Sequence, residues 1–361
     1  MNDPDRIPTA ILGASGYLGQ HFARLLANHP IFAPPLLGAG ERSEGQRLED
    51  VWQLIEEPPA ELARERLRRR TPAQLERDGV QLVFGALPSG FAGAVETECR
   101  RRGIHVFTNA ADHRMDADVP LLVPEVNAAH LRALAGKSRG RTLLVTNPNC
   151  TAAGLVVALA PLWPLLTPRA IHVTTFQALS GAGFPGVPSL AITDNVIPYI
   201  RNEEEKVAAE TNRMLGTARR GRVVPAGVPV LANCARVGVR DGHLEAVTIE
   251  SDPMPSLTDL RRAWAGFDPL RSLGLPTSPH PPVEVRSEPD RPQPVRDRWA
   301  GRPDRARGMA VVVGRIRRDP PFLRFFVLSH NAVRGGAGGS VLNAELANAL
   351  GLIRAGRVKD P

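Results

Sequence analysis

TAILGASGYLG (residues 9–19) is the stretch of sequence that decides the fold. A short apolar run leads into glycines at positions 13, 16 and 19, and Phe22, Leu25 and Leu26 follow at helical spacing. This order predicts a strand, a glycine-rich turn and a helix. Glycines let the backbone approach a pyrophosphate, and free N–H groups at a helix start bind its charge. The pattern therefore favours a dinucleotide site over a tight turn without a ligand.

Strand and helix signals alternate through the rest of the first 150 residues. Strands are expected at 34–38, 80–87 and 104–108, with a helix running through Arg102. Such alternation predicts a doubly wound, mostly parallel sheet. Beyond it, helices are expected at 151–163, 203–215 and 341–352, and strands at 171–177, 230–239, 244–251, 309–316 and 323–329. The strands at 230–239 and 244–251 are expected to be joined by the turn 240–243.

The fold class predicted from this pattern is α/β: a Rossmann-type doubly wound dinucleotide-binding domain followed by an α+β domain. Residues 1–149 and 332–361 are assigned to the first domain and residues 150–331 to the second. The length of 361 residues suits two domains, and 43% hydrophobic residues is normal for a globular enzyme. No apolar stretch reaches about 18 residues, and no signal peptide is recognisable. We therefore expect a cytoplasmic protein without membrane association.

Two basic regions invite a nucleic-acid interpretation, since the formal net charge is +8. Arginines at 64, 66 and 68–70 lie among Glu61, Glu65 and Leu67 and are expected to form a solvated helix face. The Pro- and Arg-rich stretch 276–304 is expected to be an exposed loop or arm. Aromatic residues are rarely interleaved with these arginines, so no nucleic-acid partner is predicted. Nonspecific binding through residues 291–307 is the alternative.

The three cysteines at positions 99, 150 and 234 have no CxxC spacing, so neither zinc nor a disulfide framework is predicted. Cys150 follows Asn147-Pro148-Asn149 and precedes a helix. A helix N-terminus lowers the pKa of a thiol, so Cys150 is predicted to be a nucleophile rather than a buried structural residue. Cys99 and Cys234 lie in helix and strand patterns and are predicted to be structural.

A thiolate nucleophile needs an acid/base partner, and His243 stands out because it lies in the turn between two predicted strands. We expect the turn to leave its imidazole accessible. Arg236, on the preceding strand, could bind a carboxylate. For the cofactor, Glu41 would suit NAD, whereas Arg42 and Ser43 could hold the 2′-phosphate of NADP. These residues alone leave that choice open.

Motifs along nearly the whole chain carry a family resemblance. They are GASGYLG (13–19), ALPS (86–89), RMD (114–116), VPLLVPEVN (119–127), TNPNCT (146–151), QALSGAG (177–183), EEEK (203–206), RV (236–237), DGH (241–243), DRPQP (290–294), HN (330–331) and NAE (343–345). In this order they resemble the archaeal and fungal branch of aspartate-semialdehyde dehydrogenase. The resemblance implies NADPH-dependent reductive dephosphorylation of L-aspartyl 4-phosphate, in lysine, threonine, methionine and isoleucine biosynthesis, by a homodimer or homotetramer.

The resemblance also implies a role for individual residues. Cys150 would be the nucleophile, His243 the acid/base, and Gln177 the residue that orients the substrate. Substrate ligands would be Arg236 for the α-carboxylate, Glu203 for the α-amino group, Lys206 and Arg114 for phosphate, and Asn149 beside the cysteine. The cofactor, NADP rather than NAD, would be held by Gly13, Ser15, Gly16, Tyr17, Leu18, Arg42, Ser43, Ser89, Ser180, Gly181 and Asn331. No metal is implied.

Some positions depart from the family pattern and keep alternatives open. Ala235 stands where an asparagine often precedes the arginine, and Gly38-Ala39-Gly40-Glu41 replaces a plainer serine-containing turn. A paralogue that reduces another acyl donor, such as malonyl-CoA, shares these motifs. N-Acetyl-γ-glutamyl-phosphate reductase and glyceraldehyde-phosphate dehydrogenase place the cysteine in different contexts. A non-catalytic nucleotide-binding protein is a further alternative, although both Cys150 and His243 are present.

Overall fold

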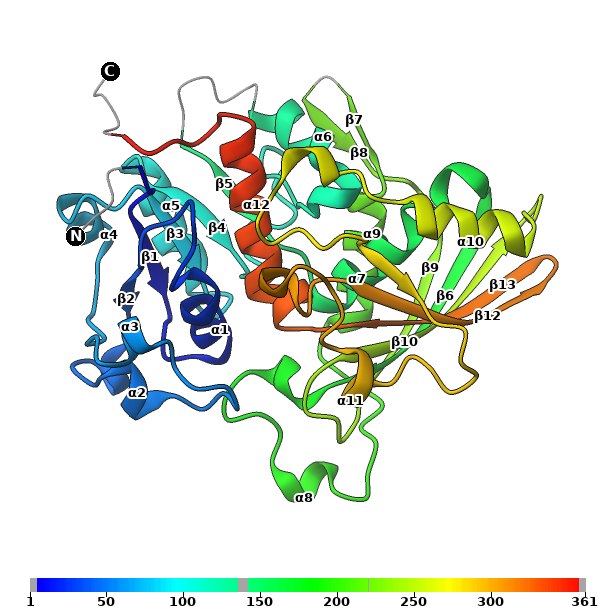
Figure 1. Ribbon diagram of the computed structural model, residues 1–361, viewed down its shortest axis with the longest axis horizontal. Helices are drawn as coiled ribbons and strands as arrows, with labels where there is room; N and C mark the ends of the chain where they lie inside the picture. Colours follow the sequence, from blue (N-terminus) through cyan, green and yellow to red (C-terminus); the bar gives the residue numbers. More distant parts are fainter. Residues whose placement is uncertain (1–4, 136–141, 220, 357–361) are drawn as a thin grey trace.

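The computed structural model describes residues 5–135, 142–219 and 221–356, which form an α/β protein with two main sheets (Figure 1). The first sheet is parallel, in the order β2-β1-β3-β4-β5. Its strands are β1 (Thr9–Leu12), β2 (Leu36–Gly38), β3 (Leu82–Gly85), β4 (His105–Thr108) and β5 (Leu144–Thr146). Its helices are α1 (Tyr17–Leu26), α2 (Leu48–Val51), α3 (Ala60–Ala63), α4 (Pro72–Arg77), α5 (Ala92–Arg101) and α6 (Pro124–Ala135). The predicted doubly wound domain is confirmed.

The second sheet is mixed, in the order β11-β12-β13-β10-β6-β9. Its strands are β6 (Pro168–Gln177), β9 (Val230–Arg236), β10 (His243–Ser251), β11 (Val283–Val285), β12 (Val311–Asp319) and β13 (Phe322–Ser329). The helices of this half are α7 (Cys150–Leu159), α8 (Ser189–Ile192), α9 (Glu203–Met214), α10 (Leu257–Gly266) and α11 (Pro294–Asp297), and a small hairpin joins β7 (Thr217–Arg219) to β8 (Arg222–Val224). Side chains of α7, α9 and α10 share one hydrophobic core with the inner face of the sheet.

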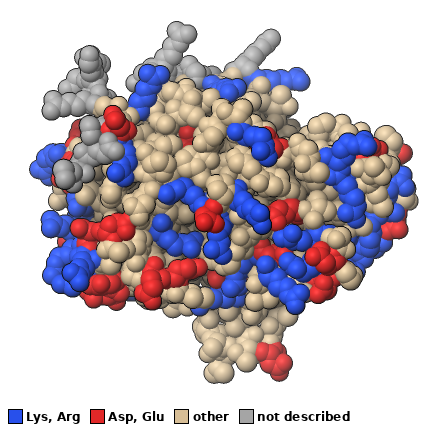
Figure 2. All heavy atoms as spheres, in the orientation of Figure 1, with Lys and Arg blue, Asp and Glu red and all other residues tan. Residues whose placement is uncertain are grey.

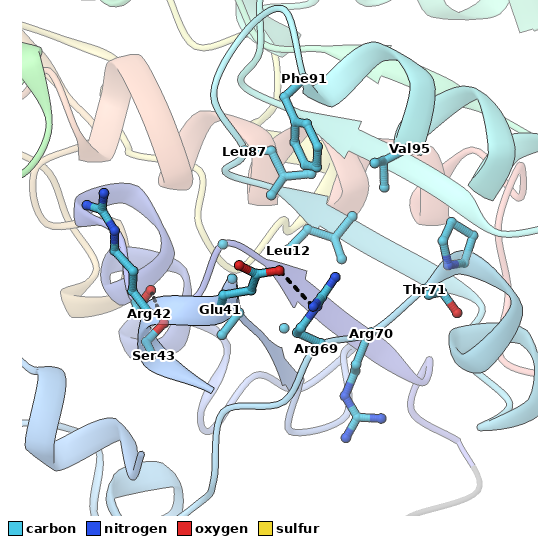
Figure 3. A pocket seen from close by; sticks show the side chains of 16 residues that line it. Leu12, Glu41, Arg42, Ser43, Arg69, Arg70, Thr71, Leu87, Phe91 and Val95 are labelled. Atoms are coloured by element: carbon cyan, nitrogen blue, oxygen red, sulfur yellow. Dashed lines mark hydrogen bonds and ion pairs between the residues drawn. The ribbon is translucent and has the colours of Figure 1, made fainter. Parts of the chain in front are cut away.

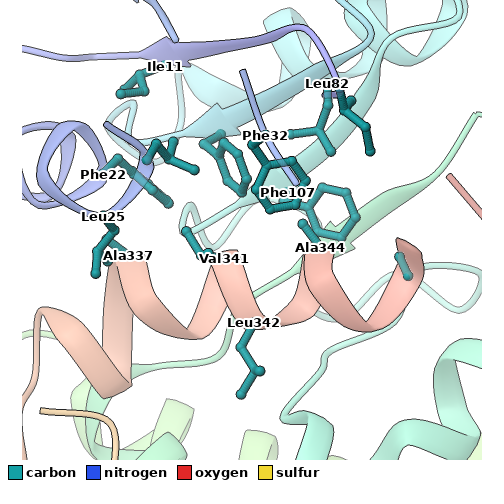
Figure 4. Packing of buried hydrophobic residues seen from close by; sticks show 14 of the residues in the cluster. Ile11, Phe22, Leu25, Phe32, Leu82, Phe107, Ala337, Val341, Leu342 and Ala344 are labelled. Atoms are coloured by element: carbon teal, nitrogen blue, oxygen red, sulfur yellow. The ribbon is translucent and has the colours of Figure 1, made fainter. Parts of the chain in front are cut away.

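The last helix, α12 (Gly338–Ala349), returns to the parallel sheet. Figure 4 shows Val341 and Ala344 of this helix facing a cluster of aromatic residues that includes Phe22, Phe32 and Phe107. All of these side chains are buried. Burial of apolar area stabilises by roughly 25 cal/mol per Å², so this contact firmly attaches the end of the chain to the first sheet.

The arginine cluster at 64–70 does not form the predicted helix. α3 ends at Ala63, and the following residues run extended along the outer edge of β2. The Arg68 N–H donates to the Leu37 carbonyl at 3.1 Å, and the Ala39 N–H donates to the Arg68 carbonyl at 3.0 Å. Because the Arg68 bridge is parallel, this segment occupies the place of an outer strand in a doubly wound sheet. Its next residues therefore reach the carboxyl end of the sheet.

Two further expectations are corrected. The strands at 230–236 and 243–251 are not paired, because β6 lies between them, parallel to β9 and antiparallel to β10. The Pro- and Arg-rich stretch 276–304 is not simply an exposed loop: it contains β11 and α11, and its Asp297 is buried. Arg291 and Arg286 donate to that carboxylate, from Nε atoms at 2.6 and 3.2 Å. Charge pairing inside the stretch makes a compact layer beside β12.

The surface carries both charge signs. Figure 2 shows Lys and Arg interspersed with Asp and Glu on the visible face. Mixed charge of this kind is an ordinary solvated surface rather than a continuous basic footprint. The segment around α8 extends from the body at the bottom of Figure 1. Its Leu190 is 93% exposed and its Tyr199 is 65% exposed.

Candidate active site

Three polar side chains lie side by side on adjacent strands of the second sheet. The register pairs Gln177 of β6 with Arg236 of β9, and His243 begins β10 on the other side of β6. All three are buried, at 1%, 7% and 0% exposed. We call Arg236, Gln177 and His243 the polar row. The expectation of an accessible turn imidazole is therefore wrong, because His243 belongs to a central strand beneath α7.

Cys150 faces the polar row from the first residue of α7. Its Sγ lies 3.1 Å from Nε2 of His243. The turn before it is fixed by Asn149, whose Oδ1 accepts the N–H groups of Thr151 at 3.0 Å and Ala152 at 3.1 Å. Gly335 packs so closely that a Cβ there would come within 2.6 Å of the Cys150 Cβ. Asn149 and Gly335 therefore fix the backbone and the Cβ of Cys150 beside the polar row.

The hydrogen bonds of His243 select its tautomer. The backbone N–H of Ala178 donates to Nδ1 at 3.1 Å, so the ring proton resides on Nε2, toward Cys150. Burial, with Arg236 nearby, lowers the pKa of His243 to about 3. The neutral imidazole is thus a donor toward the sulfur. Such a donor can stabilise a thiolate or negative charge on an oxygen of a bound acyl group.

The Cys150 thiol is not the low-pKa group that its helix N-terminus predicts. Burial raises its pKa to about 12, and the charge of Glu203 acts in the same direction. Arg236, Arg114 and the Thr151 N–H lower it, but by less than the loss of water raises it. The closed site therefore holds a protonated thiol, and its cationic groups are the elements that favour ionisation.

Glu203, at the start of α9, organises the amides beside the sulfur. Its Oε1 accepts Nδ2 of Asn149 at 2.9 Å and Nε2 of Gln177 at 2.9 Å. The side chain is buried, with only 7% of the residue exposed. A buried carboxylate is stable only with charge or hydrogen-bond compensation, which these two amides supply in part. A cationic ligand group would complete it.

Glu210 is a site residue that the sequence analysis missed. Its Oε1 accepts from Nη1 of Arg114 at 3.0 Å, and its Oε2 accepts the backbone N–H of Asn149 at 2.6 Å. It therefore joins the predicted phosphate-binding arginine to the turn that carries Cys150. Glu203, Lys206 and Glu210 stand at helical spacings of three and four, and this was the available signal. Among the described residues, none hydrogen-bonds or pairs with the side-chain ammonium of Lys206.

A cavity of about 730 Å³ lies at the carboxyl end of the parallel sheet, and we call it the glycine-turn pocket (Figure 3). Gly13 lines it with φ +87°, and a Cβ there would meet the Ala86 carbonyl oxygen at 2.7 Å, so only glycine fits. Ser15 and Ser43 join across it, with 3.0 Å between their Oγ atoms. These features suit a dinucleotide that approaches the backbone closely. The pocket is lined by Leu12, Gly13, Ser15, Gly38–Ser43, Arg69–Pro72, Leu87, Phe91 and Val95.

Other predicted cofactor residues gather beside the polar row. Asn331 accepts the Gly242 N–H at 2.9 Å and donates to Ser180 Oγ at 2.8 Å. A Cβ on Gly181 would come within 2.6 Å of Nη1 of Arg236. These predicted cofactor residues therefore lie in two places, the glycine-turn pocket and the surroundings of the polar row.

The remaining predicted cofactor residues have contacts of other kinds. The Tyr17 hydroxyl donates to Asp241, two residues before His243. Gly16 caps the N-terminus of α1, and the Leu18 side chain lies where a Cβ on Gly336 would meet it at 2.7 Å. Ser89 is exposed, accepts the Ala111 N–H at 2.9 Å and does not line the glycine-turn pocket.

No three His, Cys, Asp or Glu side chains within the described ranges are arranged to hold a metal ion. None of the helices in those ranges is both long and apolar enough to cross a membrane.

Comparison with known families matches both halves of the chain. Residues 8–134 match the NAD binding domain of semialdehyde dehydrogenase. Residues 159–334 match the semialdehyde dehydrogenase dimerisation domain. The division between the two matches falls next to Cys150, so the sulfur lies where the two halves meet.

Individual relatives cover almost the entire chain. Aspartate-semialdehyde dehydrogenase of Archaeoglobus fulgidus is 45% identical over 346 residues, covering 94% of this chain and 98% of its own. Malonyl CoA reductase (NADP) of Metallosphaera sedula is 38% identical, covering 94% of this chain and 96% of its own. The crystal structure of aspartate semialdehyde dehydrogenase with NADP from Candida albicans has a TM-score of 0.86 at 34% identity, covering 96% and 100%.

Proposed function

The chain belongs to the aspartate-semialdehyde dehydrogenase family, and from this premise we propose that it reduces L-aspartyl 4-phosphate to L-aspartate 4-semialdehyde with NADPH. The observation that carries this proposal is the 3.1 Å contact between Cys150 Sγ and His243 Nε2, enclosed by groups of both charge signs. A substrate with an ammonium, a carboxylate and a phosphate requires such a site. The product would enter the biosynthesis of lysine, threonine, methionine and isoleucine.

Cys150 is the nucleophile in this proposal. Its sulfur attacks the acyl carbon, the bond from that carbon to the phosphate oxygen breaks, and a thioester forms as phosphate leaves with the thiol proton, as hydrogen phosphate. Lys206 and Arg114 stabilise the departing phosphate charge. The backbone N–H of Cys150 is available to the acyl oxygen, whereas those of Thr151 and Ala152 are held by Asn149 Oδ1. NADPH supplies the hydride.

His243 acts after the thioester has been reduced. Its Nε2–H donates a hydrogen bond to the oxyanion that hydride addition leaves on the thiohemiacetal, and His243 stays neutral. When the carbon–sulfur bond breaks, the aldehyde leaves and the sulfur departs as thiolate, ready to be reprotonated or to attack again. The Ala178 N–H keeps Nδ1 occupied throughout, so the Nε2–H of His243 stays on the side that faces the substrate.

Substrate choice rests on the charges beside the sulfur. Arg236 would bind the α-carboxylate in bidentate fashion, and Gln177 would orient the acyl group. Glu203 would bind the α-ammonium, which supplies the cation that its buried carboxylate lacks. Malonyl-CoA is the second candidate, favoured by the similarity to the Metallosphaera sedula reductase. It has no ammonium group, so Glu203 favours aspartyl phosphate.

The cofactor is proposed to span the two groups of predicted residues. Its adenosine end would occupy the glycine-turn pocket, with the 2′-phosphate near Arg42 and Ser43. Its nicotinamide would lie near Asn331, Ser180 and Gly181, beside the polar row. The structure of the Candida albicans relative with NADP supports NADP over NAD.

Domain division, oligomeric state and cellular location can be proposed from the same observations. We propose that residues 1–149 and 332–361 form the dinucleotide-binding domain and residues 150–331 the catalytic domain, which agrees with the packing of α12. A homodimer or homotetramer is supported by the dimerisation-domain match and by the exposed apolar side chains near α8. A cytoplasmic location suits three free cysteines, one of which must stay reduced to react.

The test is phosphate-dependent reduction of NADP by the purified enzyme with L-aspartate semialdehyde, with NAD and malonyl-CoA assays in parallel. We expect turnover that requires inorganic phosphate, favours NADP and is lost in Cys150→Ser. Malonyl-CoA reduction without aspartate semialdehyde oxidation would replace the proposed substrate with the second candidate. Absence of both activities in folded enzyme that binds NADPH would contradict both.

A further inference from the structure

Arg69 lies at the glycine-turn pocket, although the sequence pattern places it on a solvated helix face. The segment that carries it runs parallel to β2, held by the two backbone hydrogen bonds of Arg68. Parallel strands deliver their next residues to the carboxyl edge of the sheet, where dinucleotides bind. Arg69 therefore reaches the same edge as Gly13 and Gly40, and all three line the pocket.

Arg69 pairs with the acid that would otherwise favour NAD. Its Nη1 lies 2.9 Å from Oε1 of Glu41. Figure 3 shows these two side chains pointing toward one another, while Arg42 extends away from the pair. Arg70, the next residue, pairs instead with Asp78. Glu41 thus has a specific cationic partner within the pocket.

The position of Glu41 makes this pairing consequential. It begins a short 3-10 helix directly after the Gly38–Gly40 turn that follows β2, where an acid accepts the ribose 2′-hydroxyl of NAD. An unpaired carboxylate there would repel a 2′-phosphate, which carries up to two negative charges. Pairing with Arg69 neutralises the carboxylate, and the remaining donors, Arg42 and Ser43, are left for the phosphate.

We propose that Arg69 is a specificity-determining residue of the cofactor site, which neutralises Glu41 so that the pocket accepts a dinucleotide carrying a 2′-phosphate. This inference rests on the proposed NADPH-dependent function. Both side chains are largely exposed, at 59% for Arg69 and 80% for Glu41, so a 2′-phosphate can reach the pocket beside the intact pair. Glu41 therefore does not restrict the pocket to NAD, although an acid at this position is typical of NAD sites.

The test is direct titration of NADPH and NADH binding by fluorescence, with no acyl substrate present. We expect Arg69→Ala to raise the Kd for NADPH about fivefold, the scale of an exposed charge interaction, while the Kd for NADH changes little. Adding Glu41→Gln to Arg69→Ala should recover much of the NADPH affinity, because the repelling charge is gone. Arg68→Ala is the matched control. It removes the same charge from the neighbouring residue, whose side chain is exposed and does not line the pocket.

Equal losses for both cofactors in Arg69→Ala would overturn the inference, as would a failure of Glu41→Gln to restore NADPH binding. An Arg68→Ala effect as large as that of Arg69→Ala would reduce the result to net charge and also overturn it. These readouts do not depend on the acyl donor. Wild-type enzyme that failed to bind NADPH would instead contradict the proposed function.

Discussion

Glu41 and Arg69 at the glycine-turn pocket are 80% and 59% exposed, whereas His243 in the polar row is fully buried. In the pocket, charges meet in water and can exchange partners at little cost. In the polar row, every charge is desolvated and must be held by fixed hydrogen bonds. The comparison indicates that cofactor choice is adjustable in this fold, while the chemistry at Cys150 is rigidly specified.

Replacing the nucleophile is the strongest way to test this separation. Cys150→Ala should lower turnover by about 10⁴-fold or more, since no other group can form the thioester. NADPH binding should be unchanged, because Cys150 does not line the glycine-turn pocket. Steady-state kinetics and NADPH titration on the same preparation measure both quantities. A parallel loss of NADPH affinity would show that the two regions are coupled rather than separate.

Substitution of Glu210 tests how strongly activity depends on the fixed hydrogen bonds around Cys150. Glu210→Gln removes the charge that holds both Arg114 and the Asn149 N–H. We expect kcat to fall about tenfold, because the turn carrying Cys150 loses a charged acceptor. The KM for phosphate should fall, because the charge of Arg114 is no longer compensated.

The split between kcat and KM separates this role from general damage to the fold. Glu205→Gln is the control, since Glu205 is an exposed acid in the first turn of the same helix. A rise in the KM for phosphate with unchanged kcat would show that Glu210 orients Arg114 instead of supporting the cysteine turn.

The parts of the fold and site that could be predicted from the sequence are those determined by adjacent residues. The glycine turn and the Asn-Pro-Asn-Cys turn are local signals, in which adjacent residues determine both shape and chemistry. Strand alternation was enough to predict the α/β class. The family resemblance added Gln177, Glu203 and Asn331, which no local pattern singles out.

Long-range strand order accounts for the expectations that failed. The burial of His243 follows from insertion of β6 between two strands that look like a hairpin. The placement of Arg69 depends on backbone hydrogen bonds to β2, roughly thirty residues earlier in the chain. The raised pKa of Cys150 depends on how completely the site is closed, whereas the helix N-terminus is only one local contribution.

The smallest predicted effect concerns stability, and it tests whether a buried histidine makes the protein sensitive to acid. His330 is buried, its Nε2 has no partner among the described residues, and burial lowers its pKa to about 3. Between pH 6.5 and 3 the unfolded chain binds a proton there and the folded chain does not. Stability must therefore fall as pH falls through this window, by about 1.4 kcal/mol per pH unit for each such histidine.

His330→Asn should weaken this acid sensitivity without removing it, because burial also lowers the pKa values of other histidines, namely His21, His105, His130 and His243. The asparagine Oδ1 can replace Nδ1 as acceptor for the N–H groups of Ala332 and Val333, both at 3.4 Å. Thermal midpoints measured from pH 7.5 to 4.5 should decline less steeply in the variant than in the wild type. The exposed His172→Asn, as control, should follow the wild-type curve. Parallel curves for wild type and His330→Asn would show that His330 contributes nothing to the acid sensitivity. Burial of His330 would then have no energetic consequence that distinguishes it from the exposed groups of the glycine-turn pocket.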